Sequence, residues 1–344
     1  MIALAFAVLV VAASYAGVEW VRRLALRRGV LDVPVERSSH QVPTPRGGGI
    51  VIVVATLLAP LIAGGLVSGH VPKAVAAWLL GGAAVALTGW VDDVRSVSSR
   101  TRLVLQLAAA VVLLAAAGCW SELELPALGR ATLGWVGCAL AVLWIVGMTN
   151  AYNFMDGIDG IAAGQAVVAG LAWAVLGHHA EVAGVSAIGV GMALSGAWFL
   201  LHNRPPARIF MGDVGSGFLG FTVAALPLLL ASGGTDVDGG RLPVVAAAVV
   251  WPFLFDATFT FIRRLARGEN VFEGHRSHLY QRLVIAGASH AQVSALYAGW
   301  ALISSALGLL WLWRWSGTGL VLLAWAALSA AGMIAAVRMR ERRP

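Results

Sequence analysis

Four polar side chains recur at every third position of the segment TNAYNFMDGIDG: Asn150, Asn153, Asp156 and Asp159. If this segment is helical, side chains three positions apart are neighbours. They would then form a polar ridge at the edge of an apolar stretch, where polar groups are usually functional. Amides and carboxylates in this pattern suit the hydroxyl or acetamido groups of a ligand. The alternative is a turn, because Asn, Asp and Gly are typical turn residues.

Three further acids stand at the ends of apolar stretches: Asp92 and Asp93 as an adjacent pair, and Asp213 within FMGDVGSG. Adjacent carboxylates repel, which favours a nearby magnesium ion or arginine. Small residues at a helix N-terminus leave amide groups free for phosphate, and Asp213 is placed to hold a hard cation beside that phosphate. The alternatives are a solvated helix end for the pair and an ordinary N-cap role for Asp213.

Basic residues gather in the segment GHRSHLYQRL, which contains His275, Arg276, His278 and Arg282. Two histidines could contribute to a zinc site, but no cysteine or third histidine stands near them in the sequence. Anion recognition is favoured instead, because arginine binds phosphate with two parallel hydrogen bonds.

Asp256 stands apart, inside an apolar stretch one turn after Pro252, where we expect a kink. It precedes Arg263 by seven residues, or roughly 10 Å along a helix. An acid at membrane depth is usually functional or paired. The sequence leaves open whether Asp256 is functional or the partner of a helix-end arginine.

The elements that position these groups are membrane helices. The 344 residues are 59% hydrophobic and 12% charged, with a mean hydropathy of +0.81, whereas soluble domains carry about 25% charged residues. About 20 apolar residues cross the hydrocarbon layer. We therefore predict an all-α, polytopic membrane protein with ten or eleven transmembrane helices. The candidate stretches are 2–21, 49–68, 74–90, 103–118, 134–149, 158–176, 183–201, 215–232, 243–263, 291–313 and 319–337.

Charge orients these helices. With the N-terminus outside and alternating crossings, one face collects 20 of the 24 Lys and Arg residues, Arg37 and Arg343 among them, and the positive-inside rule makes that face cytoplasmic. This accounts for the net charge of +7 without nucleic acid, which we exclude as a partner. Lys73, the only lysine, falls outside, which excludes a Schiff base at the inner face. The first stretch is followed by its arginines, unlike a signal peptide.

One transmembrane domain spans residues 1–344, with polar cytoplasmic loops at about 90–102, 149–160, 202–217 and 268–283. The outer loops hold only scattered acids, such as Glu122, Glu124, Asp236 and Asp238. We expect no strand pattern of consequence. Cys119 and Cys138 are the only cysteines, and because Cys138 lies in an apolar run we expect neither a disulfide framework nor a Cys-based metal site.

Together, the four loops offer acids for magnesium, arginines for phosphate and amides for a sugar, all beside lipid. Phosphoryl transfer suits such parts, because its catalysis is mostly positioning and charge neutralisation. Two other classes compete. A transporter would line a mid-membrane path with ionisable groups, whereas here they lie at one face. A non-catalytic lipid-phosphate binding or assembly protein would tolerate Asp213→Asn.

Four segments in this order, DDVRSVSSRTRLVLQ, NAYNFMDGIDGIAAG, RIFMGDVGSGFLG and GHRSHLYQRL, resemble the polyprenyl-phosphate N-acetylhexosamine-1-phosphate transferases, the MraY/WecA superfamily of glycosyl transferase family 4. The resemblance runs from about Arg37 to Arg282. It implies transfer of a sugar 1-phosphate from a UDP-N-acetylhexosamine to undecaprenyl phosphate, with release of UMP and a requirement for Mg²⁺ or Mn²⁺. It also implies the bacterial cytoplasmic membrane and a homodimer.

The resemblance also assigns roles to residues. Asp92, Asp93 and Asp213 are the implied catalytic acids, with Asp213 and Asp92 as metal ligands and the Asp92–Asp93 pair assisting the lipid phosphate or the metal. Phe210 would stack on uracil. The other implied substrate-binding residues are Arg46, Arg102, Asn153, Asp156, Asp159, His275, Arg276 and His278. Between direct attack by the lipid phosphate and a covalent aspartyl intermediate, we favour direct attack, because an aspartate amid magnesium and arginines is stabilised as a ligand.

Two features point to a branch of the family. NAYNFMDGIDG is closer to the enzymes that initiate O-antigen and other surface glycans than to the peptidoglycan branch. HRSHLYQRL departs from the HIHH pattern of the enterobacterial common antigen type and resembles the WbpL-like group. The implied donor sugar is therefore an N-acetylated deoxy or fucosamine-type sugar in preference to N-acetylglucosamine.

Overall fold

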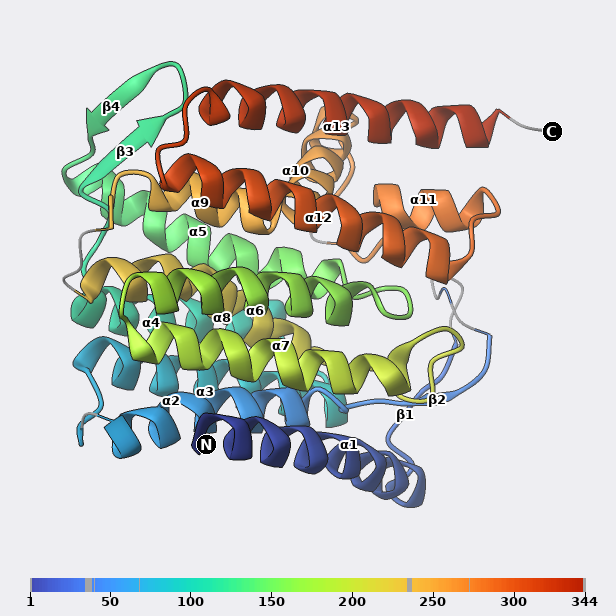
Figure 1. The fold of residues 1–344 in the computed structure, drawn as a ribbon. Helices are drawn as coiled ribbons and strands as arrows, with labels where there is room; N and C mark the ends of the chain where they lie inside the picture. The colour runs from blue at the N-terminus through green and yellow to red at the C-terminus, as the bar shows by residue number, and fades with distance from the viewer. Residues whose placement is uncertain are drawn as a thin grey trace.

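The computed structural model describes residues 2–34, 39, 41–67, 69–233, 237–271 and 273–342. The predictions that involve Arg37, Asp236 and Arg343 lie outside these residues. The described chain is a bundle of helices that run roughly alongside one another (Figure 1). The helices are α1 (Ile2–Arg28), α2 (Ile50–Val67), α3 (Lys73–Val94), α4 (Ser99–Ala117), α5 (Trp135–Phe154), α6 (Ile161–His179), α7 (Ala183–Asn203), α8 (Asp213–Ser232), α9 (Leu242–Val249), α10 (Trp251–Ala266), α11 (Leu279–Ile285), α12 (His290–Leu312) and α13 (Thr318–Glu341).

The predicted multi-pass, all-α architecture is confirmed. A helix covers most of every predicted apolar stretch, and among the described residues eight helices are long and apolar enough to cross a membrane on their own. These are α3 to α8, α12 and α13. The apolar part of α2, Ile50–Gly64, is shorter.

The ninth predicted stretch, 243–263, is not a single helix. It breaks at Val250, where α9 and α10 meet at 84°. Pro252 follows the break, and its ring and missing N–H oppose a continuous helix there. The kink expected near this proline is confirmed, although it is a full change of direction. As a result α10 leaves the line of α9 and crosses the bundle (Figure 1).

Helix α8 forms the centre of the bundle, and 94% of its apolar window is buried. A helix that is apolar on every side lies in a protein core or a membrane, and here α3 and α5 are among the helices that pack against it. Its first residue is Asp213. The core helix therefore presents an acid at the middle of one end of the bundle.

Two small hairpins mark the two ends of the bundle (Figure 1). Antiparallel strands β1 (Leu31–Asp32) and β2 (Thr44–Pro45) lie at the end where α8 begins, and β3 (Glu122–Leu125) and β4 (Gly129–Thr132) lie at the opposite end. Neither pair of strands was expected from the sequence. Arg130 joins the second hairpin to the loop before α9, because it contacts Glu122, Glu124 and Asp238.

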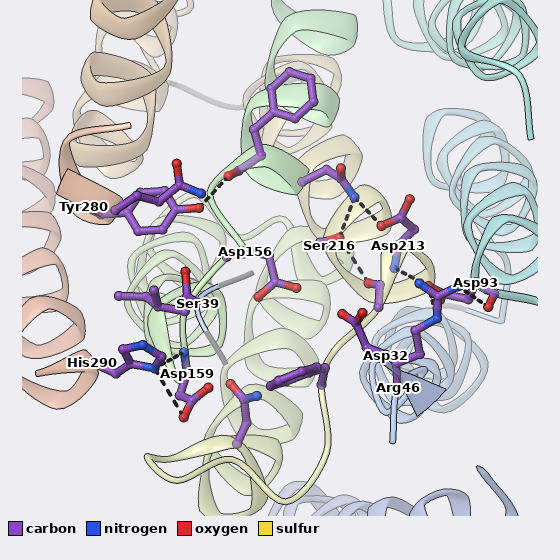
Figure 2. A pocket seen from close by; sticks show the side chains of 18 of the residues that line it. Asp32, Ser39, Arg46, Asp93, Asp156, Asp159, Asp213, Ser216, Tyr280 and His290 are labelled. Atoms are coloured by element: carbon purple, nitrogen blue, oxygen red, sulfur yellow. Dashed lines mark hydrogen bonds and ion pairs between the residues drawn. The ribbon is translucent and has the colours of Figure 1, made fainter. Parts of the chain in front are cut away.

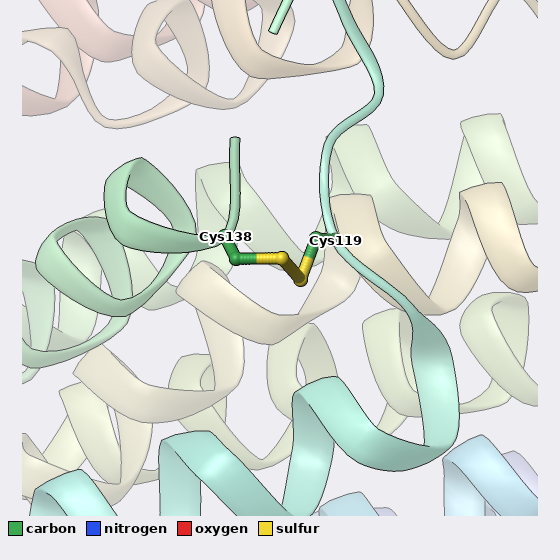
Figure 3. Close-up of a disulfide and its surroundings, with 2 residues drawn as sticks. All are labelled: Cys119 and Cys138. Atoms are coloured by element: carbon green, nitrogen blue, oxygen red, sulfur yellow. A yellow bond between two sulfur atoms is a disulfide. The ribbon is translucent and has the colours of Figure 1, made fainter. Parts of the chain in front are cut away.

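The expectation that the cysteines form no disulfide is wrong. Cys119 and Cys138 form a disulfide at the β3–β4 end, with Cα atoms 4.8 Å apart (Figure 3). The hairpin between them folds the chain back, so residues 19 apart in sequence meet. Cys138 belongs to an apolar run, but that run starts at Trp135, so the cysteine lies in the first turn of α5 rather than deep in the hydrocarbon layer.

We expect this disulfide to be intact in protein isolated from membranes. Maleimide applied without reductant should label neither cysteine, and labelling after reduction should modify both, as read by intact mass. Replacing both cysteines by serine should lower thermal stability, because closing a loop of this size contributes about 3 kcal/mol. Maleimide labelling before reduction would contradict the pairing.

Candidate active site

The loops at the β1–β2 end surround a polar pocket of about 360 Å³ (Figure 2). Its walls come from β1, α3, α5, α7, α8, α11 and α12, together with the loops between them. Among the described residues, five carboxylates and one guanidinium group, that of Arg46, line it. The carboxylates belong to Asp32, Asp93, Asp156, Asp159 and Asp213. The pocket is therefore strongly acidic.

Asp93 holds the start of the core helix. Its buried carboxylate accepts hydrogen bonds from the backbone N–H groups of Asp213 (3.0 Å) and Val214 (3.2 Å). Arg46 compensates its charge: one guanidinium nitrogen lies 3.8 Å from the carboxylate and another donates to the Asp93 carbonyl. A carboxylate at a helix N-terminus is stabilised by the helix dipole. Asp93 thus caps α8 from a neighbouring helix.

This capping corrects two interpretations of the FMGDVGSG segment. Asp213 is not the N-cap, because the position before the helix is Gly212. The helix also lacks free amide groups for phosphate: Asp93 takes the first two, and the next two, of Gly215 and Ser216, donate to the Gly212 carbonyl.

Two glycines permit this close fit. Gly212 has a φ of +77°, a left-handed conformation that favours glycine, and a Cβ there would lie 2.5 Å from the Asp93 carboxylate. On α3, a Cβ on Gly89 would lie 2.3 Å from the Asp213 carbonyl oxygen. Both positions bring backbone against backbone or carboxylate, so neither leaves room for a larger residue.

The Asp213 side chain is held from two sides. Asn153 donates to one oxygen at 3.0 Å and also to the Ser216 hydroxyl. Arg102 donates to the other oxygen at 3.3 Å and, with the same nitrogen, to Asp92 at 2.7 Å. An arginine therefore bridges the two predicted metal ligands. Among the described residues, no group of three or more Asp, Glu, His or Cys side chains is arranged to hold a metal by itself.

The predicted ridge of 150–159 is half helix and half turn. Helix α5 ends at Phe154, so Asn150 and Asn153 lie on the helix while Asp156 and Asp159 lie in the following turn. Asn150 pairs with Gln106 on α4. The alternative prediction of a turn, based on the Asn, Asp and Gly residues, is thus confirmed for the second half of this segment.

Asp156 points into the centre of the pocket (Figure 2). No hydrogen bond to its carboxylate is found among the described residues. Burial raises the pKa of the Asp156 carboxyl well above its ordinary value, and the negative charges of Asp213, Asp93 and Asp159 raise it further. The Asp156 carboxyl is therefore harder to ionise than an ordinary aspartate, and a nearby positive charge would favour its ionised form.

Asp159, by contrast, joins segments of the pocket wall. Its carboxylate accepts from the Ala207 N–H at 3.0 Å and lies 3.4 Å from the His290 ring, and its carbonyl accepts from Ser294. Asp159 thereby ties the 202–208 loop to the start of α12.

The segment 275–281 closes one side of the pocket. Tyr280 donates to the Phe154 carbonyl at 2.9 Å, and a Cβ on Gly157 would meet the Tyr280 hydroxyl at 2.1 Å. His275 accepts at Nδ1 from the backbone N–H of Ser277, which leaves the proton on Nε2. Burial and the nearby charges of His278, Arg264 and Arg263 lower the pKa of His275 to about 4.

The pocket brings together eight of the predicted site residues: Arg46, Asp93, Asn153, Asp156, Asp159, Phe210, Asp213 and His275. Arg102 lies beside it, and Asp92 lies behind Arg102 and also accepts from the Val97 N–H. Two more predicted residues, Arg276 and His278, are also outside its lining. Arg276 is exposed, and His278 is buried against Asp256.

Sequence analysis did not assign Asp32, Ser39, Tyr280, Gln281, Asn203, Ser216 or His290 to the pocket. Tyr280 and Gln281 stand inside the GHRSHLYQRL segment, whose departure from the HIHH pattern was the available signal. Asp32 and His290 carry no motif. They reach the pocket only through the β1–β2 hairpin and the start of α12.

A second hollow, of about 730 Å³, adjoins the first. It is an apolar groove along α5 and α10, with walls that include Leu140, Leu143, Phe261 and Ile262. Phe154 and His275 line both spaces. The acidic pocket and the apolar groove therefore meet at these side chains.

Comparison with known proteins identifies the class. Residues 75–231 match the model of the family described as glycosyl transferase family 4. The chain is 33% identical over 272 residues to the "Probable undecaprenyl-phosphate N-acetylglucosaminyl 1-phosphate transferase" of Bacillus subtilis, covering 78% of this chain and 74% of that protein. This chain belongs to glycosyl transferase family 4.

Other relatives agree. The "Decaprenyl-phosphate N-acetylglucosaminephosphotransferase" of Mycolicibacterium smegmatis is 33% identical, over 83% of this chain and 76% of its own length. The "Phospho-N-acetylmuramoyl-pentapeptide-transferase" of a Synechococcus strain is also 33% identical, over 81% and 82%. The family predicted from the four motifs is confirmed.

Gly212→Ala should damage the site. A side chain in the left-handed region costs roughly 1–2 kcal/mol, and this one would also displace Asp93 from the α8 amides. We expect a lower melting temperature in detergent and loss of most activity. Gly299→Ala on α12, where an added Cβ meets no atom within 4 Å, should leave both unchanged. A Gly212→Ala protein with the melting temperature of the wild type would contradict the close fit.

The pKa of His275 predicts a flat pH response. With a value of about 4, His275 is neutral throughout the range from about pH 5.5 to 8 and donates through Nε2 without a positive charge. His275→Gln should therefore lower kcat/KM by a similar factor at both ends of this range, measured in steady-state assays. A factor that changes by more than about tenfold with pH would show that His275 titrates within it.

Proposed function

We propose that this protein transfers an N-acetylhexosamine 1-phosphate from a UDP-linked donor to a polyprenyl phosphate such as undecaprenyl phosphate. The observation that carries the proposal is the meeting of an acidic pocket and an apolar groove at Phe154 and His275. A water-soluble diphosphate suits the first space and a prenyl chain suits the second. The two phosphates would come together where the spaces join.

The acidity of the pocket supports a divalent cation. A diphosphate would be repelled by five lining carboxylates and one guanidinium group unless a cation intervened. Magnesium commonly takes one or two carboxylates and completes its shell with water and phosphate oxygens, so a preformed cluster of three acids is not needed. Asp213 and Asp156, which both line the pocket, are the residues that would hold the cation. Asp92 would also bind it if Arg102, which now lies between Asp92 and Asp213, moved aside. Bound Mg²⁺ or Mn²⁺ would neutralise charge on the phosphates.

The chain's own residues bind and orient. Arg102 now contacts the carboxylates of Asp92 and Asp213. When a phosphate binds, its guanidinium group can bind a phosphate oxygen in place of one of them, since guanidinium groups bind both. Neutral His275 can donate from Nε2 to an oxygen at the junction of pocket and groove. Phe210, at the pocket wall, presents a ring on which a uracil can stack.

Direct displacement fits these positions. An oxygen of the polyprenyl phosphate would attack the phosphorus that bears the sugar, forming the new diphosphate bond. The bond from that phosphorus to the bridging oxygen would break, and UMP would leave with its electron pair. Asp213 is engaged by Asn153 and Arg102, which suits a ligand better than a nucleophile.

We infer that the pocket faces the cytoplasm. Disulfides persist in oxidising compartments, and the Cys119–Cys138 bond lies at the opposite end of the bundle. The concentration of Lys and Arg on the pocket side supports the same orientation. The homodimer stays a prediction.

Two relatives whose names give N-acetylglucosamine match over three quarters or more of this chain. They favour that sugar as the donor over the deoxy sugars that the HRSHLYQRL segment suggested.

Transport is disfavoured: among the described residues, the buried Asp, His and Arg side chains all belong to or adjoin the pocket end. They are Asp93, Asp159, His202, Asp256, Arg264 and His278.

Purified protein with undecaprenyl phosphate, Mg²⁺ and a panel of UDP-sugars should release UMP, with UDP-N-acetylglucosamine among the best donors. Asp213→Asn and Asp156→Asn should each reduce the rate at least about 100-fold, as expected for groups that balance phosphate charge, and chelation by EDTA should abolish it. Glu122→Gln, which also removes one carboxylate but in the β3–β4 hairpin, is the matched control and should retain full activity. If no UDP-sugar yields UMP above the level of the Asp213→Asn protein, the proposal fails.

A further inference from the structure

Asp256 is a fully buried acid that does not line the pocket. It lies on α10, and its carboxylate accepts hydrogen bonds from two consecutive backbone amides, those of Leu279 at 2.8 Å and Tyr280 at 3.0 Å. These are the first two residues of α11. Because an unpaired charge in a protein interior is costly, each of these bonds holds the acid and the segment together.

Three side chains complete the shell of this acid. Tyr297 donates to one oxygen at 2.6 Å, and Thr260 to the other at 3.1 Å. The Nδ1 atom of His278 lies 3.3 Å from the same oxygen as Thr260. Arg263, the helix-end arginine considered as one alternative from the sequence, instead donates to the Ser277 carbonyl. Asp256 is therefore an anchor for α11 and not the counter-ion of a helix-end arginine.

His278 is fixed in orientation by this contact. A carboxylate only accepts hydrogen bonds, so Nδ1 of His278 carries the proton and Nε2 points away from Asp256. The ring stacks on that of Tyr280 at an angle of 20° and lies 4.9 Å from the centre of the His275 ring. The rings of His275, His278 and Tyr280 thus lie side by side, and the middle one is hydrogen-bonded to Asp256.

The anchored segment supplies a wall of the polar pocket. His275, Tyr280 and Gln281 all line it, and Tyr280 reaches across to the Phe154 carbonyl at the end of α5. The break at Val250 is what brings Asp256 beneath this wall, because it directs α10 across the bundle.

We propose that Asp256 is a positioning residue for the donor side of the pocket. It acts through the amides of Leu279 and Tyr280 and through His278, and it sets where His275, Tyr280 and Gln281 meet the sugar nucleotide. This inference rests on the function proposed above for the identity of the substrate. The anchoring itself does not depend on that function.

Hydrogen exchange of the intact protein in detergent tests the anchoring directly. In Asp256→Asn, the side-chain amide presents a donor where two amide groups need acceptors, so peptides containing residues 279 and 280 should exchange about tenfold faster or more. Peptides from the middle of α12 should be unchanged. Equal exchange at 279 and 280 in the two proteins would overturn the anchoring.

Kinetics test the positioning. Asp256→Asn should raise KM for the UDP-sugar about tenfold, the cost of losing one well-made contact, and leave KM for undecaprenyl phosphate within about twofold. A merely structural role would reduce the fraction of active protein, which lowers the apparent kcat without moving KM. Tyr297→Phe is the matched control: it removes one donor from the same carboxylate but leaves the segment's own bonds, and its KM for the donor should stay near that of the wild type.

Asp256→Glu provides a second variant if the Asn protein does not fold. It keeps an anionic acceptor but shifts the oxygens by one methylene, so the KM for the donor and the exchange at residues 279 and 280 should both rise, by less than in the Asn variant. Wild-type protein that releases no UMP would contradict the proposed function and leave the exchange result to decide the anchoring. Active wild type with variants that alter only kcat would overturn the positioning proposal.

Discussion

A single buried carboxylate, that of Asp93, sets the depth of the core helix. The N-terminus of a helix leaves amide groups that need acceptors, and α8 begins inside the bundle where little water is available. Asp93 supplies both oxygens from α3, and Arg46 from the segment after β2 balances the charge. Three parts of the chain that are distant in sequence are thereby joined at one point. The first residue of the core helix, Asp213, emerges beside that point.

The same constraint shows why the pocket contains so many acids with distinct surroundings. Asp93 and Asp159 form bonds that hold the walls in place, whereas Asp156 carries no such bond among the described residues and faces the open space. Asp213 lies between these extremes. Its position is fixed by Asn153 and Arg102, but it still lines the cavity. The aspartates of the pocket thus serve different purposes: some hold its walls together, and others face the cavity.

Much of the fold follows from sequence, because backbone groups in lipid must be satisfied within each helix and hydropathy marks those helices. The break at Val250 and the Cys119–Cys138 pairing did not follow in the same way. Pro252 indicated a kink, but its angle depends on packing against α12 and α5. Cys138 was misjudged because distance from the membrane surface depends on where α5 starts, which the β3–β4 hairpin decides.

The site was predictable at the level of loops and less so at the level of atoms. The four polar segments do converge, and eight of the assigned residues share the pocket. The prediction of free amide groups at the start of α8 was wrong. No local pattern in the sequence reveals that Asp93, 120 residues earlier, accepts hydrogen bonds there. His278 was predicted to bind the substrate because of its residue type, whereas in the structure its ring contacts Asp256 and supports the wall of the pocket. Asp32 and His290 depend on chain reversals that leave no motif.

The bend between α9 and α10 has a kinetic corollary. Beside the bend lies the apolar groove, whose wall residues Leu143 and Phe261 are 68% and 49% exposed, so under the proposed function a prenyl chain would enter sideways without leaving its leaflet. Encounter with the enzyme is then diffusion in two dimensions. The governing quantity for the acceptor is its mole fraction among the surrounding lipids, and diluting the bilayer with inert lipid slows turnover even when the bulk amount of acceptor is held constant.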